Sequence, residues 1–276
     1  MSKGSILGSL RSIVIADDPE EDLILTTDFE QIELWVYAFY TKCKWMLDIH
    51  AKKEYIYGTV YEDFWAPQKF FQEGKPRRKK FKLESVSEKF LRRAKAIPLG
   101  FLYGRSAAAV AEEHGWSVSE AEAYRRKWFR LCPELLESYA RDRFSMEQQG
   151  YIRYPWGHII WYPKQKPSDV YANRGQHPAA CILLESILMI EEEIRRRRYR
   201  NTRIMLSVHD SLSFNVGGGK RQPERVVEFA EEVLMPILGR QIPQLDNHTF
   251  RCSMEVGERW DWDTEDYESW KERIHA

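Results

Sequence analysis

Residues 23–35 contain the pattern that most limits how this chain can fold. An apolar and β-branched run at 23–27 is typical of a buried strand, and from Ile32 to Phe39 the apolar residues recur at the spacing of one helix face. We therefore expect Asp28 at the end of the strand, where a carboxylate on a rigid element can bind a hard divalent cation. On this stretch alone, capping of the following helix is the simpler interpretation of Asp28.

Two later stretches change the balance between these interpretations. Residues 202–216 alternate apolar and polar on both sides of His209-Asp210, which predicts a hairpin with an acid at its tip. Lys95, Leu99 and Tyr103 are spaced four apart, so they share one face of a helix.

In this order, the three stretches resemble motifs of the family A DNA polymerases, the bacterial DNA polymerase I family. Residues 28–34 are similar to the family's Asp-aromatic-x-Gln-Ile-Glu-Leu, and residues 95–104 to its Lys-x-x-x-(Phe/Tyr)-Gly-x-x-Tyr-Gly helix. Residues 208–211 are similar to its Val-His-Asp-Glu turn, and the similarity extends from about residue 10 to residue 262.

The resemblance implies an α+β fold in two parts. A palm, with an antiparallel sheet and helices, is expected at residues 1–45 and 151–276. A mostly helical fingers insertion is expected at residues 46–150.

The resemblance also implies template-directed DNA synthesis by a two-metal mechanism. Two Mg²⁺ ions, or Mn²⁺, are expected to be held by the carboxylates of Asp28 and Asp210 and the backbone carbonyl of Phe29. Asp28, Asp210 and Lys95 are the expected catalytic residues, with Lys95 facing the triphosphate.

The remaining expected contacts follow from the same resemblance. Those with the nucleotide are Gln31, Glu33, His50, Arg92, Lys95, Leu99 and Tyr103. Those with primer and template are Gln176, His209, Asn173 and Arg105. Glu33, packed against Tyr103, is expected to block the 2′-hydroxyl of a ribonucleotide, which favours dNTPs over NTPs.

Four positions depart from the family pattern and leave two alternatives open. Leu91 stands where the family has an arginine, so Arg92 is the substitute, and Leu99 replaces an aromatic residue. With Pro98 and Ser211, which replaces a glutamate, these changes permit a catalytically inactive polymerase-like DNA-binding or scaffold subunit. Ser211 also permits an RNA polymerase or primase-like enzyme, an alternative that Gln31 and Glu33 oppose.

Further local signals predict the elements around these motifs. Pro98 predicts a kink or break at residues 94–98 of a helix that starts near residue 86. The predicted helices end or begin at capping signals, and the predicted strands alternate in polarity: helices at 118–131, 133–150, 177–200 and 223–238, and strands at 151–163 and 250–256.

Composition indicates which partners and which cellular compartment to expect. The formal net charge is zero, but basic blocks at 75–80 and 195–198 could grip phosphates locally. The four cysteines are far apart and have no zinc-finger or redox spacing, so we expect buried thiols of a reducing compartment. No signal peptide and no membrane-length apolar run is recognisable, which predicts a cytoplasmic protein or one in the DNA-containing compartment of a host cell.

Only 27 residues precede Asp28, where family members have a thumb and often an exonuclease. The sequence therefore predicts the catalytic part of a split or truncated polymerase that lacks proofreading. Its expected partners are primed DNA, dNTPs and a second protein that supplies a thumb and possibly an exonuclease, with no membrane.

Overall fold

The computed structural model describes residues 13–65, 88–164, 166–260 and 264–276, and it divides into two compact units. The sheet unit comprises Met1–Ile32, Ala179–Pro243 and Asn247–Ala276, and the helical unit comprises Glu33–Pro178 with Gln244–Asp246. These limits, near residues 32 and 178, differ from the expected domain boundaries at 45 and 150. The basic block at 75–80 lies outside the described residues, as does the predicted helix start near residue 86.

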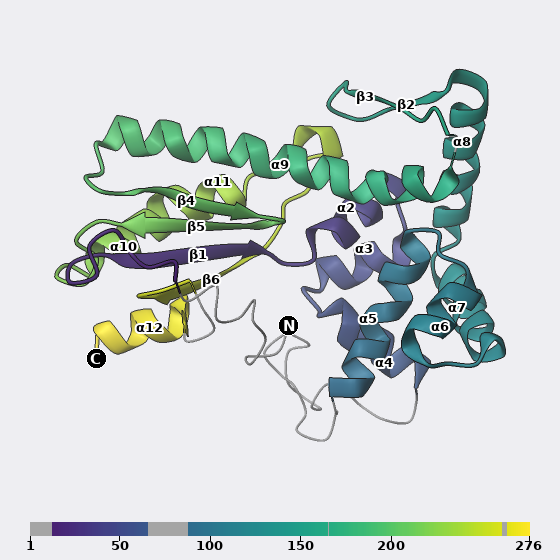
Figure 1. The fold of residues 1–276 in the computed structure, drawn as a ribbon, viewed down its shortest axis with the longest axis horizontal. Helices are drawn as coiled ribbons and strands as arrows, with labels where there is room; N and C mark the ends of the chain where they lie inside the picture. Colours follow the sequence, from purple (N-terminus) through teal and green to yellow (C-terminus); the bar gives the residue numbers. More distant parts are fainter. Residues whose placement is uncertain (1–12, 66–87, 165, 261–263) are drawn as a thin grey trace. The chain divides into compact units, whose positions relative to one another are not determined.

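A five-stranded antiparallel sheet organises the sheet unit, with strand order β4-β5-β1-β6-β7 (Figure 1). The strands are β1 (Leu23–Phe29), β4 (Arg203–Val208), β5 (Ser211–Val216), β6 (Cys252–Gly257) and β7 (Glu265–Asp266). Strand β1 is central, and the two strands that pair with it, β5 and β6, both come from the last third of the chain. The predicted α+β class, with an antiparallel sheet and helices, is confirmed.

Helices cover this sheet where a strand is buried on both faces, as β5 is. Leu212 to Val216 of β5 are all buried, and the ring of Phe214 lies 5.3 Å from that of Phe229 in α10. The predicted helix at 223–238 is α10 (Glu224–Phe229), a π-helical segment η1 (Ala230–Leu234) and α11 (Met235–Leu238). A 3₁₀ turn, η2 (Pro243–Leu245), follows, and α12 (Tyr267–Ile274) packs on β6.

The helical unit contains most of the remaining helices. They are α2 (Ile32–Thr41), α3 (Lys44–Ala51), α4 (Ile56–Phe64), α5 (Glu88–Leu102), α6 (Ala107–His114), α7 (Val118–Leu131) and α8 (Pro133–Gln149). The predicted limits of α7 and α8 are confirmed by their caps: the Ser117 hydroxyl accepts from the Glu120 N–H at 3.2 Å, and Gly150 ends α8 at φ 75°. A hairpin of β2 (Tyr151–Arg153) and β3 (Ile159–Trp161) follows.

Two helices contain an internal proline. Helix α5 is unbroken across Pro98, so of the predicted kink or break the break is wrong, and the kink stays a prediction. Helix α9 (Pro167–Arg197) starts ten residues before the predicted start at His177 and contains Pro178. In α5 the nearby Ala94, Ile97 and Phe101 are buried, and this burial offsets the lost backbone hydrogen bond; in α9, Ala179 next to Pro178 is buried.

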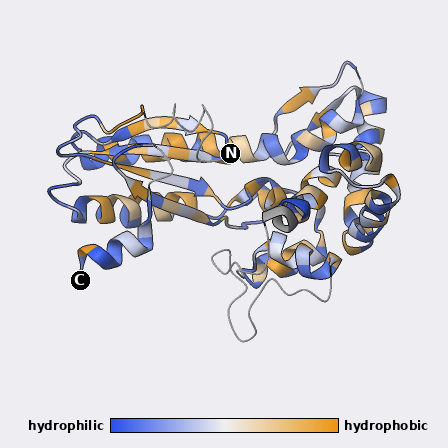
Figure 2. Cartoon of the chain, turned by 60° about the horizontal axis from the view of Figure 1, so that its bottom comes forward, coloured by the Kyte–Doolittle hydropathy of each residue, from blue (hydrophilic) through white to orange (hydrophobic). Residues whose placement is uncertain are grey.

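Hydrophobic and hydrophilic residues alternate along most helices, as expected of helices with one buried face (Figure 2). No helix among the described residues combines the length and the apolar character that a membrane crossing requires. Cys43, Cys132 and Cys181 are buried, Cys252 is partly buried, and all four are thiols.

Candidate functional site

Two carboxylates of the sheet unit come from strand β1 and from the turn between the adjoining strand β5 and β4. Asp28 lies inside β1, paired with Ser211 of β5 on one side and Ser253 of β6 on the other. The next residue, Phe29, donates its N–H to the carbonyl of Asp210 at 3.2 Å. Because α2 begins only at Ile32, Asp28 is not the N-cap of that helix, and the capping interpretation is wrong.

A third carboxylate, that of Glu30, lies near these two, and the pKa of Cys252 indicates its presence. Cys252 lies opposite Phe29 in the β1–β6 register. Its pKa is raised by burial and then by the negative charges of Asp28, Glu30 and Asp210. The negative charges of all three carboxylates are therefore felt at the same thiol of the sheet, that of Cys252.

Sequence reasoning missed Glu30, although it stands within the first motif. The Glu30 N–H donates to the carbonyl of Arg251 at 2.8 Å, and the Arg251 Nε lies 3.9 Å from the Glu30 carboxylate. This pairing with the segment that leads into β6 becomes visible only when the sheet is assembled. Its one sequence signal was a second acid two residues after Asp28.

The β4–β5 hairpin, which carries Asp210, has a turn with a strained backbone residue, His209, and a side-chain hydrogen bond from Ser211. His209 is the first residue of the two-residue turn and adopts φ 57°, a left-handed conformation that is uncommon outside glycine. The Ser211 hydroxyl donates to the carbonyl of Val208 at 2.9 Å, so the residue that replaces the family's glutamate stabilises the turn.

Gln31 has the same left-handed backbone conformation, at φ 53°, just after the strand that bears Asp28. Its buried side-chain Oε1 accepts no hydrogen bond from the described residues. Left-handed non-glycine residues cost about 1 kcal/mol or more and cluster at functional sites. Both loops that border the carboxylates therefore contain strained backbone.

The donor set of this site suits a hard divalent cation. The two aspartate carboxylates are half-buried, and the backbone carbonyl of Phe29 follows Asp28 directly in the chain. Oxygen-only donors of this kind fit Mg²⁺ or Mn²⁺ and do not select soft metals.

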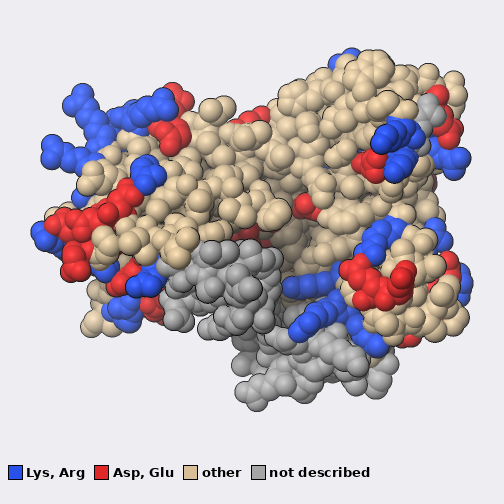
Figure 3. Space-filling model, viewed as in Figure 1, with Lys and Arg blue, Asp and Glu red and all other residues tan. Residues whose placement is uncertain are grey.

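In the helical unit, α5 presents the predicted polar face. Lys95 is exposed and Leu99 and Tyr103 are partly exposed, whereas Ile97 and Phe101 are fully buried. Figure 3 shows Lys and Arg side chains gathered over α5. The ammonium of Lys95 lies 5.5 Å from the ring centroid of Tyr57.

The two positions considered for the triphosphate-side arginine lie earlier on the same helix. Arg92, three residues before Lys95, is exposed. The side chain of Leu91 lies outside the described residues.

Glu33 and Tyr103 make the contact that the sequence predicted. Glu33 lies in the first turn of α2, and the Tyr103 hydroxyl donates to its carboxylate. The two residues are 70 positions apart in the sequence. This hydrogen bond fixes the Glu33 side chain against the end of α5.

Two other predicted contact residues have partners within the helical unit. The ring of His50 lies 4.9 Å from those of both Trp35 and Phe39, so it forms part of an aromatic cluster. Arg105 forms an ion pair with Glu113 of α6, and this pairing lowers the pKa of Glu113.

Two of the predicted primer and template residues, Asn173 and Gln176, lie on α9. Gln176 is exposed, and the Asn173 amide donates to the hydroxyl of Tyr162 at 3.1 Å. Between them, the buried Arg174 makes a two-bond pair with Asp142 of α8, which sequence reasoning missed. That pair ties the segment holding Asn173 and Gln176 to α8.

Comparison with known proteins decides the family. The model of DNA polymerase family A matches residues 3–262. This chain belongs to DNA polymerase family A. Among its relatives in the family, DNA polymerase I of Pseudomonas aeruginosa is 27% identical over 231 residues, which is 80% of this chain and 23% of the relative. The thermostable DNA polymerase I of Thermus aquaticus is 23% identical over 249 residues, 87% of this chain and 27% of the relative.

The family A fold is also found among solved structures. The polymerase domain of Pol1 from M. smegmatis, solved in complex with DNA primer-template and dNTP, matches with a TM-score of 0.72 and 20% identity. The match covers 91% of this chain and 42% of that chain. This family A chain spans about a quarter of the length of the two curated relatives above.

Proposed function

We propose that this chain catalyses template-directed transfer of dNTPs to a primer 3′-hydroxyl. The observation that carries this proposal is that Asp28 in β1 adjoins Asp210 in the β4–β5 turn of a family A sheet. On this proposal the sheet unit is the palm and the helical unit is the fingers. Primed DNA and dNTPs are the partners, the same two kinds of ligand that accompany the M. smegmatis polymerase domain in its solved complex.

Asp28, Asp210 and the Phe29 carbonyl would hold two Mg²⁺ ions. When bound, these ions neutralise the charge that develops in phosphoryl transfer and acidify the attacking hydroxyl. Strand β1 and the β4–β5 turn supply what such catalysis needs from the protein, which is fixed positions for negative ligands. Glu30 adds negative charge to the same point of the sheet and would strengthen cation binding.

The α5 face would bind the incoming nucleotide. Lys95 is exposed on that face, where an ammonium can form charge-assisted hydrogen bonds with a triphosphate. The Glu33–Tyr103 hydrogen bond favours dNTPs, because it holds a carboxylate in place against a ribose 2′-hydroxyl. This same contact argues against the RNA-synthesising alternative.

Primer extension tests this function. The purified chain, a primed DNA template and Mg²⁺ are incubated with dNTPs or NTPs, for the wild type and for Asp210→Ala. We expect extension with dNTPs that Asp210→Ala reduces at least about 100-fold, since one properly placed charge ligand contributes several kcal/mol in a water-poor site. Asp17→Ala is a matched control, because Asp17 pairs with Arg203 in the same unit and should leave extension unchanged.

Equal extension by the wild type and by Asp210→Ala would contradict the proposed site. Extension with NTPs alone would support the RNA-synthesising alternative. If neither nucleotide set is used and folded wild type binds primed DNA, either the predicted thumb-bearing partner is required or the site is inactive. A pull-down for a thumb-bearing chain, followed by extension with that chain added, separates these two outcomes.

A further inference from the structure

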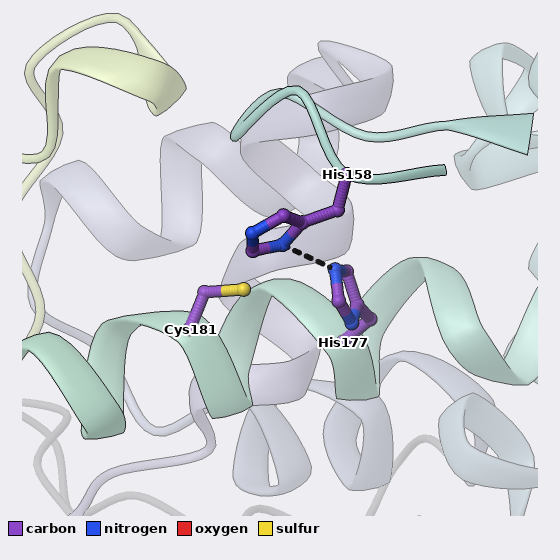
Figure 4. A group of neighbouring side chains, drawn as sticks. All are labelled: His158, His177 and Cys181. Atoms are coloured by element: carbon purple, nitrogen blue, oxygen red, sulfur yellow. Dashed lines mark hydrogen bonds between the residues drawn. The ribbon is translucent and has the colours of Figure 1, made fainter. Parts of the chain in front are cut away.

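Three residues of metal-binding types, two histidines and one cysteine, meet away from the carboxylates described above. His158, His177 and Cys181 each direct a possible ligand atom to one point, and these atoms all lie within 4.8 Å of one another (Figure 4). In the part of the chain that the structure describes, this is the one group of three or more His, Cys, Asp or Glu residues that meets this spacing.

The backbone holds these residues firmly. His177 and Cys181 are four apart on the continuous helix α9, so the helix itself places them on one face. His158 lies in the β2–β3 turn, where its carbonyl accepts from the Tyr154 N–H at 2.8 Å. The Tyr154 ring lies 4.6 Å from the His177 ring and packs the hairpin against the helix.

The distances fit a small tetrahedral ion. The Nδ1 of His158 lies 3.2 Å from the Nε2 of His177, and a tetrahedral Zn²⁺ with bonds of about 2.0–2.1 Å to nitrogen separates two such atoms by about 3.3 Å. The Cys181 sulfur, within 4.8 Å, must approach to about 3.6 Å, a shift of about 1 Å that a small side-chain rotation provides. Figure 4 shows the sulfur pointing from α9 toward His158.

We propose that His158, His177 and Cys181 bind one Zn²⁺ ion, with water in the fourth position. Two imidazoles and a thiolate select Zn²⁺ over Mg²⁺, which prefers oxygen donors. The site is therefore chemically distinct from the Asp28–Asp210 site. Without the ion, the two rings share a hydrogen bond that needs one of them as donor; with it, both ring nitrogens direct lone pairs at the metal.

The bound ion would fix the β2–β3 hairpin to α9. His177 directly follows Gln176, a proposed primer or template contact, so the ion would order the backbone from which that side chain projects. Its role is structural positioning, separate from the nucleotidyl transfer reaction.

Cobalt substitution tests the site in the full chain after treatment with a chelator. Co²⁺ titration of wild type should give the visible absorption of tetrahedral cobalt together with a thiolate-to-cobalt charge-transfer band, and one equivalent of Zn²⁺ should remove both. Cys181→Ser should abolish the charge-transfer band, and His158→Gln, in the exposed turn, should weaken Co²⁺ binding at least about tenfold. Circular dichroism checks that each variant is folded.

Cys43→Ala and His275→Gln are matched controls that should keep both spectral features. The absence of a thiolate band in wild type, or its persistence in Cys181→Ser, would overturn the proposal. Asp210→Ala should bind Co²⁺ through the thiolate like wild type, so failure of the proposed polymerase activity and failure of this site are separate outcomes.

Discussion

Among single residues, Glu33 and Tyr103 give the most specific prediction about the substrate, namely a preference for dNTPs over NTPs. Their hydrogen bond holds a carboxylate at the end of α5, where the nucleotide sugar is proposed to lie. Glu33→Ala should raise the efficiency of NTP relative to dNTP incorporation at least about tenfold, the usual effect of one discriminating contact.

Single-nucleotide incorporation with matched dNTP and NTP measures this ratio. Glu137→Ala, an exposed acid of α8, is the control and should leave it unchanged. An unchanged ratio in Glu33→Ala would show that sugar choice resides elsewhere.

The residues predicted from the sequence were those in contiguous motifs. Asp28, Glu33, Lys95, Tyr103 and Asp210 were assigned roles from the resemblance of their stretches to family motifs, and the predicted Glu33–Tyr103 contact is present. Glu30 and the buried Asp142–Arg174 pair were not recognised, because their importance depends on partners brought close by folding. A buried ion pair leaves no periodic signal in the sequence.

For helices and strands, local capping and alternation predicted α7, α8 and the acid-bearing hairpin well. Helices with an internal proline were predicted less well: α5 continues unbroken through Pro98, and α9, predicted to start at His177, begins ten residues earlier and continues through Pro178. A proline removes one hydrogen bond locally, whereas the burial that compensates is contributed by residues distant in sequence.

Two arginines of the basic block at 195–198 are paired with glutamates, which distinguishes the block from a surface of arginines available to bind phosphate. At the end of α9, Arg196 and Arg197 both contact Glu193, and Arg197 also pairs with Glu232 of η1. Hydrogen bonds from these two arginines lower the pKa of Glu193 from its ordinary 4.5 to about 2. Ion pairs between these charged residues thus stabilise the C-terminal end of α9.

This pairing predicts an acid-sensitive contribution to stability. A carboxylate with a lowered folded-state pKa stabilises the fold above pH 4.5, and the contribution disappears as the pH falls toward 2. The stability advantage of wild type over Glu193→Gln should therefore shrink steadily across that interval. Urea unfolding at several pH values measures it, with Glu192→Gln as the neighbouring control. A constant difference between wild type and variant would contradict the assigned cause.

At the scale of the whole molecule, the chain forms two compact units. Their limits, near residues 32 and 178, differ from the boundaries at 45 and 150 that were expected from the order of the motifs. The boundary near residue 178 falls inside α9, at Pro178, and the sequence offered no signal that one continuous helix would belong to both units. The sheet unit also joins residues from the beginning, middle and end of the chain, a pairing that hydrophobic alternation alone does not specify.

The central claim is that Asp28 and Asp210, 182 positions apart in the chain, form one metal-binding site. The most direct measurement is the rate of single dNTP incorporation by Asp28→Asn, Asp210→Asn and the double variant, at saturating Mg²⁺ and dNTP. Groups that act as a unit are strongly non-additive. We predict a loss of at least about 100-fold in each single variant, with the double variant within about tenfold of the slower single one. Single variants that each keep a rate close to wild type would contradict the account.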